Sequence, residues 1–200
     1  MGSMLIILVF LGVVGAFVLW GVGIYNGLIT ARNAFRNAFA QIDVQLQRRF
    51  DLIPNLVETA RAYMSHERET LEAVTAARTA AQSGLAAAKA NPGDPEAMAT
   101  LAATQGQLNG VLGRLMMVAE AYPDLKANQN MMQLTEELTS TENRVAFARQ
   151  AYNDSVMAYN NKREVFPSSV IAGAFNFAPA ALLDIPADRA EVREAPKVQF

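Results

Sequence analysis

The residues that come nearest to an active site are Ser65-His66-Glu67-Arg68-Glu69-Thr70-Leu71, which contain the single histidine of the chain. A His-Glu pair on a helical bundle is the pattern of a phospho-accepting helix. The proline that usually follows the threonine in that pattern is missing, and no Gly-rich nucleotide-binding lobe follows in the chain. We therefore do not expect phosphotransfer, and we interpret His66 as a surface residue.

Metal and nucleophile chemistry have equally little support. One histidine and no cysteine argue against a zinc site, which needs several such ligands. A di-iron bundle would need paired Glu-x-x-His segments, and the chain has none. Asp43, Glu67, Glu137 and Glu142 could bind a hard cation through oxygen, but ion pairs between helices explain them as well. No Gly-x-Ser-x-Gly elbow is present. The sequence predicts no catalytic residue, no metal site and no cofactor.

Polar residues do stand out on faces that should be apolar. The heptad periodicity puts Arg49, Glu67, Gln105 and Thr141 at core-facing positions. A buried charge needs a partner, because desolvation costs several kcal/mol per ion. We therefore predict a structural polar layer in which Glu67 and Glu142 meet arginines. Its members would be Arg49, Glu67, Glu142, Arg144 and Arg149, with Arg36 as a further candidate partner. Replacing Glu142 with alanine should then cost several kcal/mol of stability. A polar groove for a ligand is the alternative.

One element dominates the positioning of everything else. Met4–Tyr25 is a run of 22 residues without a charge, and a helix of that length crosses a hydrocarbon core of roughly 30 Å. Gly12-x-x-x-Ala16 and Gly23-x-x-x-Gly27 give it small-residue faces for helix packing. A cleaved signal peptide is the alternative, although no basic residue precedes the run. The segment predicts a transmembrane anchor over residues 4–25.

The remaining chain shows apolar residues at steps of three and four, which predict four helices at about 26–49, 54–89, 95–121 and 128–166. The first should continue from the anchor without a break. Asp51 and Pro54 mark a tight helix reversal, because proline lacks the N–H that a helix interior needs; a kink in one long helix is the alternative. Gly106, Gly110 and Gly113 in the third helix predict close packing of a neighbouring helix.

These elements predict an all-α fold, in which the N-terminal transmembrane helix is continuous with an antiparallel up-down four-helix bundle over residues 26–167. Because the first helix leaves the membrane, the fourth returns to it. The apolar segment 168–186 should therefore lie near the membrane, where it docks on the bundle, rests at the lipid interface or contacts a neighbouring copy. Residues 187–200 are polar and predict a mobile tail.

The chain resembles the LemA family. The resemblance spans Tyr25 to about Phe177. Its longest motifs are Ile42-Asp43-Val44-Gln45-Leu46, Asp51-Leu52-Ile53-Pro54-Asn55-Leu56-Val57 and Tyr122-Pro123-Asp124-Leu125-Lys126-Ala127-Asn128, followed by Thr141-Glu142-Asn143-Arg144. Shorter ones are Arg48-Arg49, Ala77-Arg78, Arg149, Tyr152-Asn153, Tyr159-Asn160 and Phe166-Pro167. The resemblance implies a bacterial membrane protein with one N-terminal span and a helical bundle. It implies no particular activity.

These observations favour a non-enzymatic scaffold at the bacterial inner membrane, which self-associates as a homo-oligomer or docks an unidentified protein partner. A sensor or adaptor that couples a membrane event to a cytoplasmic partner is the alternative. Arg32 and Arg36 follow the span and no basic residue precedes it, which predicts an outside N-terminus and a cytoplasmic bundle. The net charge of −2 without a basic stripe argues against nucleic acid as a partner.

Overall fold

The computed structural model describes residues 2–64 and 66–185, and the regular structure in this part of the chain is helical throughout. The helices are α1 (Gly2–Arg61), α2 (Arg68–Ala90), α3 (Pro95–Ala119), α4 (Pro123–Lys126), α5 (Gln129–Glu164) and α6 (Ser168–Ala174). The predicted all-α class is confirmed. The predicted mobile tail, residues 187–200, lies outside the described residues.

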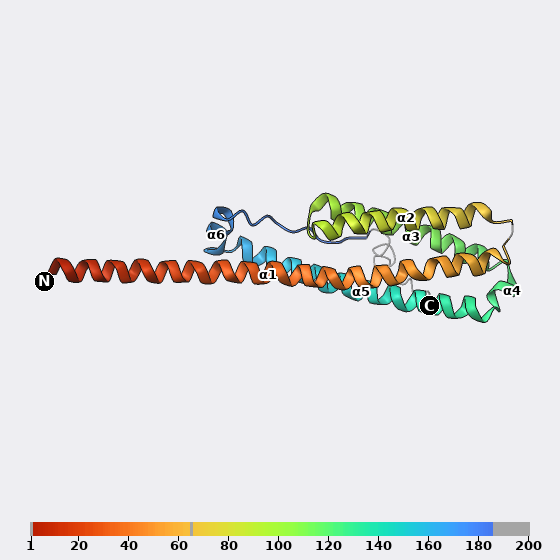
Figure 1. Ribbon diagram of the computed structural model, residues 1–200, viewed down its shortest axis with the longest axis horizontal. Helices are drawn as coiled ribbons and strands as arrows, with labels where there is room; N and C mark the ends of the chain where they lie inside the picture. Colours follow the sequence, from red (N-terminus) through yellow and green to blue (C-terminus); the bar gives the residue numbers. More distant parts are fainter. Residues whose placement is uncertain (1, 65, 186–200) are drawn as a thin grey trace, which may run out of the picture.

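The arrangement of these helices is an antiparallel bundle with a long extension. Figure 1 shows α5 lying beside the second half of α1, with the α2–α3 pair covering them on one side, while the first part of α1 projects beyond the bundle. Residues 2–20 of that projection are all exposed. Among the described helices, α1 alone is long and apolar enough to cross a membrane, with a mean hydropathy of 2.8 over a window of which none is buried. The predicted continuity of this helix with the bundle is confirmed.

The predicted reversal at Asp51 and Pro54 is wrong, because α1 continues through Pro54 and ends at Arg61. The chain turns in the segment between Arg61 and Arg68, so the second helix begins at Arg68 rather than at residue 54. Proline at position 54 leaves the carbonyl of Phe50 without its helical N–H donor. Arg78 Nε of α2 donates to that carbonyl at 2.7 Å. A side chain from the neighbouring helix therefore satisfies the group that the proline leaves open.

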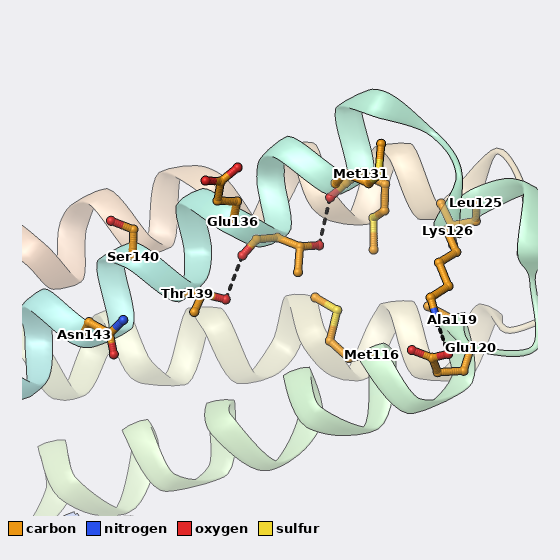
Figure 2. Close-up of a pocket in the computed structure, with 12 residues that line it drawn as sticks. Met116, Ala119, Glu120, Leu125, Lys126, Met131, Glu136, Thr139, Ser140 and Asn143 are labelled. Carbon is orange, nitrogen blue, oxygen red and sulfur yellow. Dashed lines mark hydrogen bonds and ion pairs between the residues drawn. The ribbon is translucent and has the colours of Figure 1, made fainter.

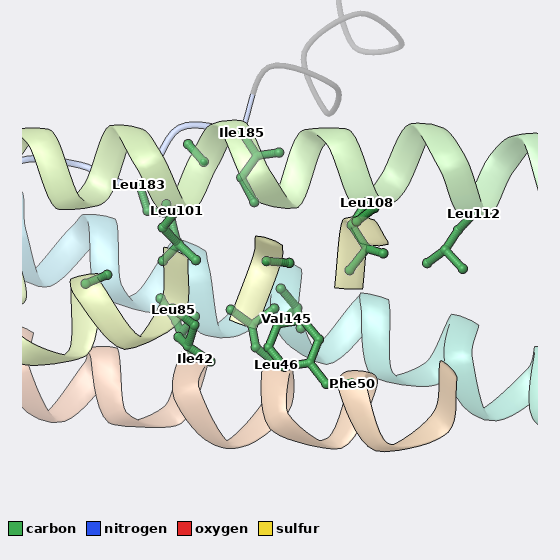
Figure 3. Packing of buried hydrophobic residues seen from close by; sticks show 14 of the residues in the cluster. Ile42, Leu46, Phe50, Leu85, Leu101, Leu108, Leu112, Val145, Leu183 and Ile185 are labelled. Atoms are coloured by element: carbon green, nitrogen blue, oxygen red, sulfur yellow. The ribbon is translucent and has the colours of Figure 1, made fainter. Parts of the chain in front are cut away.

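The core runs along the bundle axis and combines all four long helices. Figure 3 shows Ile42, Leu46 and Phe50 of α1 pointing towards the same interior as Leu85 of α2, Leu101 and Leu108 of α3, and Val145 of α5. Leu183 and Ile185, which follow α6 in the sequence, belong to the same cluster. Apolar burial at helical spacing is the term that holds these helices together, at about 25 cal/mol per Å² of apolar surface removed from water.

The three glycines of α3 do not mark a close helix contact. A Cβ added at Gly106, Gly110 or Gly113 would meet no heavy atom within 4 Å, so the prediction of close packing there is wrong. The tight approach lies at Gly84 of α2. A Cβ at that position would collide with the Thr104 hydroxyl and lie 3.4 Å from the Leu101 Cα of α3. Gly84 is the position at which the α2 and α3 backbones can come together because no side chain intervenes.

Candidate functional site

The segment after α6 is bound along the bundle in an extended conformation. We call residues 177–185 the strap. Figure 1 shows it leaving α6 and running back along the bundle. Its buried apolar side chains are those of Phe177, Ala180, Leu183 and Ile185. A segment without regular structure must find partners for its backbone polar groups if it is to be buried.

Two asparagines of α5 supply those partners in the same way. Asn160 Oδ1 accepts from the Ala180 N–H at 3.0 Å, and its Nδ2 donates to the Ala180 carbonyl at 2.8 Å. Asn153 Oδ1 accepts from the Leu183 N–H at 2.9 Å, and its Nδ2 donates to the Leu183 carbonyl at 3.1 Å. Each amide thus replaces both backbone bonds that a neighbouring β-strand would have given to one residue.

Two tyrosines of α5 add a bond each. Tyr159 Oη donates to the Ala178 carbonyl at 2.7 Å, and Tyr152 Oη donates to the Ala181 carbonyl at 2.8 Å. Burial raises the pKa of the Tyr152 phenol, and it raises the pKa of Tyr159 against the opposing effect of nearby arginines. Both phenols are therefore held protonated, which is the form that donates to a carbonyl. We call Tyr152, Asn153, Tyr159 and Asn160 the Tyr–Asn ladder.

The two periods in this contact match. Seven residues of α5 separate the two rungs of the ladder, and they rise about 10.5 Å along a helix. Three residues separate the bound strap positions, 178 from 181 and 180 from 183, and an extended chain covers about 10 Å in three residues. The strap numbers rise as the α5 numbers fall, so the two segments are antiparallel. The ladder therefore binds the backbone of an extended segment in one fixed register.

A second polar feature lies inside the bundle around Arg49, whose side chain is 4% exposed. Its guanidinium donates to Glu142 Oε1 at 3.0 Å, to Asn109 Oδ1 at 2.6 Å and to Gln105 Oε1 at 3.3 Å. These partners lie on α5 and α3, so one α1 side chain ties three helices together. The structure thus gives Glu142 one of its candidate arginine partners, Arg49, and places the predicted core-facing Gln105 in the same cluster together with Asn109.

The other predicted members of the polar layer lie elsewhere. Glu67 is half-buried at the turn before α2, where its carboxylate accepts from Tyr122 Oη at 3.4 Å. Arg144 is exposed and Arg149 is half-buried on α5. His66 is exposed. The structure therefore shows a compact cluster around Arg49 rather than a layer through all five residues.

Of the four predicted packing positions of the span, the structure shows only one in contact with another helix. Gly12, Ala16 and Gly23 are exposed, and Gly12 and Gly23 have no neighbour within 4 Å of an added Cβ. Gly27 is different, because the Lys162 side chain of α5 lies against it, with its Cε 2.9 Å from an added Cβ. The missing side chain at Gly27 therefore makes room for a lysine of the same chain.

Comparison with known proteins places this architecture in a family. Residues 38–200 match the sequence profile of the LemA family. The chain belongs to the LemA family. It is 26% identical over 166 residues to Protein LemA of Metamycoplasma hominis, a match that covers 83% of this chain and 71% of that protein.

Two further relatives of this LemA-family chain are magnetosome proteins. The chain is 26% identical over 166 residues to the magnetosome protein MamQ 1 of Paramagnetospirillum magneticum, covering 74% of this chain and 60% of the relative. It is 25% identical over 154 residues to the magnetosome protein MamQ of Magnetospirillum gryphiswaldense, covering 68% and 56% respectively. The matches thus span less than two thirds of these relatives.

Several residues that carry the LemA resemblance have a definite structural task in this chain. Pro54 and Arg78 meet through the Phe50 carbonyl, and Asp43 of α1 pairs with Lys89 of α2 at 2.6 Å. The Tyr152-Asn153 and Tyr159-Asn160 motifs form the ladder. The sequence showed these motifs but did not indicate which contacts they make. The seven-residue repeat of the Tyr-Asn pair was the signal that could have revealed the ladder.

The bundle end farthest from the N-terminus contains an apolar cavity of about 760 Å³ that sequence reasoning also missed. Figure 2 shows Met116 of α3 and Met131 of α5 facing it, with Leu125 of α4 at one side. Methionine side chains adapt to irregular apolar partners. The paired methionines 116–117 and 131–132, on either side of Pro123, were the sequence feature that could have indicated this cavity.

Among the described residues, no group of three or more His, Cys, Asp or Glu could hold a metal ion.

Proposed function

We propose that this LemA-family chain is a membrane-anchored helical scaffold, which holds its bundle at the bacterial inner membrane and there self-associates or docks a partner protein without catalysing a reaction. The observation that carries the proposal is the unbroken course of α1. One helix includes the candidate span and also contributes the frame of the bundle as far as Arg61. The orientation that we propose, with the N-terminus outside and the bundle in the cytoplasm, rests on Arg32 and Arg36.

The internal chemistry supports a structural role for the bundle. The charged and amide groups around Arg49 bond to one another, and the Tyr–Asn ladder bonds to the chain's own backbone. Such groups fix the register of helices and strap. A rigid rod joined to a span presents its outer surfaces at a constant distance and angle from the bilayer, which is what a scaffold requires.

Self-association is proposed to use the small-residue face of the span, because Gly12, Ala16 and Gly23 are exposed on one side of α1 and permit close helix contact. The test is sedimentation of the full chain in detergent at several detergent-to-protein ratios. We expect an oligomer that the double substitution Gly12→Leu and Gly23→Leu disrupts. Val14→Leu, on the opposite side of the helix, serves as the matched control. A strictly monomeric wild-type chain would overturn self-association.

The second candidate function is a sensor or adaptor that couples a membrane event to a cytoplasmic partner. The apolar methionine-lined cavity favours it, because this cavity lies at the end of the bundle opposite the span. Photo-crosslinking from Met132 in cells tests the cavity as a partner site. The adaptor requires a crosslinked protein other than a second copy, and its absence would overturn the adaptor, whereas crosslinks to the chain itself support the self-associating scaffold.

A further inference from the structure

The stretch from Val165 to Leu183 contains no charged residue, and the structure places its first half beside the end of the candidate span. Ile171 of α6 lies with its Cδ1 3.9 Å from where a Cβ would stand on Gly21 of α1. The ring of Tyr25 contacts those of Phe175 and Phe177, with centroid distances of 4.9 and 5.6 Å. The α6 region is therefore level with residues 21–25 of α1.

Several large apolar side chains of this region remain largely exposed. Val165, Phe166, Val170 and Phe175 are all more than half exposed, and Phe166 reaches 81%. We call these four residues the α6 platform. The opposite side of α6 packs inward, since Ser168 and Ala172 are buried. A group of exposed apolar residues on an otherwise well-packed domain marks an interaction surface.

Basic side chains lie one level farther along α1. Lys162 rests against Gly27, and the Arg32 guanidinium lies over the Phe177 ring at 5.3 Å from its centroid. Arg163 donates to the Phe177 carbonyl at 3.0 Å and also pairs with Glu164 at 3.0 Å. Gly21 and Arg32 are eleven residues apart, or about 16 Å along the helix. Along α1, apolar side chains are thus followed by basic ones. A membrane shows the matching order, since the edge of its hydrocarbon core is followed by anionic headgroups.

We propose that the α6 platform is a second membrane contact, at which Phe166, Val170 and Phe175 insert into the interfacial layer of an anionic bilayer beside the span. Phe175 of the platform adjoins Tyr25 at the end of the span, and the basic residues one level farther along suit lipid phosphates. Two contacts, rather than one, fix how the bundle leans and turns on the membrane. This inference rests on the placement of α1 in a membrane, which is part of the proposed function.

The experiment uses the absence of cysteine from the chain. Single variants Phe166→Cys and Val170→Cys of the full chain carry the environment-sensitive dye NBD and are reconstituted into phosphatidylcholine–phosphatidylglycerol vesicles with or without doxyl-labelled lipid. Phe147→Cys, at an exposed position of α5, is the water-facing control, and Val14→Cys in the span is the lipid-facing control. Circular dichroism establishes that each labelled variant keeps its helical content.

We expect blue-shifted emission and quenching by doxyl lipid at positions 166, 170 and 14, and neither effect at 147. Emission at 166 and 170 that matches 147 overturns the lipid contact while leaving the proposed anchor intact, provided that position 14 is quenched. A blue shift at 166 and 170 without quenching by lipid indicates burial against a protein copy, which also overturns it. Absence of quenching at position 14 contradicts the membrane placement of α1 itself.

Discussion

Arg78 Nε donates to the carbonyl of Phe50 at 2.7 Å, and this is the carbonyl that Pro54 deprives of its helical donor. The two residues lie on different helices, α2 and α1. A proline inside a helix costs about 3 kcal/mol or more, partly because of the lost hydrogen bond. The arginine replaces that bond, allows α1 to pass through Pro54 and ties α2 to α1 at the same point.

This relationship predicts that the contribution of Arg78 to the free energy of unfolding depends on Pro54. Arg78→Ala should lower the free energy of unfolding by about 1–3 kcal/mol, because it leaves a buried acceptor without a donor. In a Pro54→Ala background the helix supplies its own N–H, so the same substitution should cost clearly less. Urea unfolding of the four chains measures this coupling. Arg48→Ala, at an exposed position of α1, is the control. Equal costs of Arg78→Ala in both backgrounds would contradict the assignment.

The Tyr–Asn ladder predicts a local effect on the strap. Replacing both Asn153 and Asn160 with alanine removes four hydrogen bonds to the strap backbone, each with a net value of about 1 kcal/mol. The strap should open more often, and the amide hydrogens of Ala180 and Leu183 should exchange faster. Hydrogen exchange read by mass spectrometry measures this effect. Asn161→Ala, an exposed neighbour, should leave exchange unchanged. Wild-type protection at 180 and 183 in the double variant would refute the role of the ladder.

The sequence predicted local features better than pairings. The start of the third helix at residue 95 was predicted correctly, since an aspartate followed by a proline is a typical cap and first helical residue, and Asp94 does accept from the Ala97 N–H at 2.9 Å. The Pro54 reversal failed because the donor that rescues the helix comes from Arg78, far along the chain. The ladder was visible as a repeat on α5, but the strap binds through its backbone. The repeat could therefore mark the ladder, but no side-chain pattern of the strap could reveal which residues the ladder binds.

The surroundings of Arg49 lower the cost in stability that we expect for replacing Glu142 with alanine. The Glu142 side chain is 47% exposed, so its carboxylate keeps much of its hydration, and Arg49 also has Gln105 and Asn109 as partners. Glu142→Ala should therefore cost about 1–2 kcal/mol rather than several. Arg49→Met should cost more, because it leaves the buried Gln105 carbonyl oxygen without this donor.

A double-mutant cycle of Arg49→Met and Glu142→Ala checks the pairing by urea unfolding, with an expected coupling of about 1 kcal/mol. Arg144→Ala, an exposed arginine two residues along α5, serves as the control and should cost little. Strict additivity of the two substitutions would show that the ion pair contributes nothing. A cost for Glu142→Ala above that of Arg49→Met would reverse the order that the burial of the two side chains predicts.

Tyr152 should make stability fall at high pH. Burial raises the pKa of its phenol in the folded chain above the ordinary value near 10. Above about pH 10 the unfolded chain releases the phenolic proton and the folded chain keeps it. The unfolded state is therefore stabilised relative to the folded state as the pH rises. The stability that Tyr152 contributes is complete below pH 10 and is lost progressively as the pH rises, by about 1.4 kcal/mol at pH 11. Urea unfolding at pH 8 and pH 11 measures this loss.

Tyr152→Phe should start less stable at pH 8, because the bond to the Ala181 carbonyl is gone, and should lose less between pH 8 and pH 11 than the wild-type chain. The matched control is Phe39→Leu, which removes a ring in edge contact with Tyr152 at 5.8 Å and leaves the phenol in place. It should lower stability and retain most of the wild-type dependence on pH. If Tyr152→Phe lost as much stability as the wild-type chain over this range, the buried phenol would not be the titrating group.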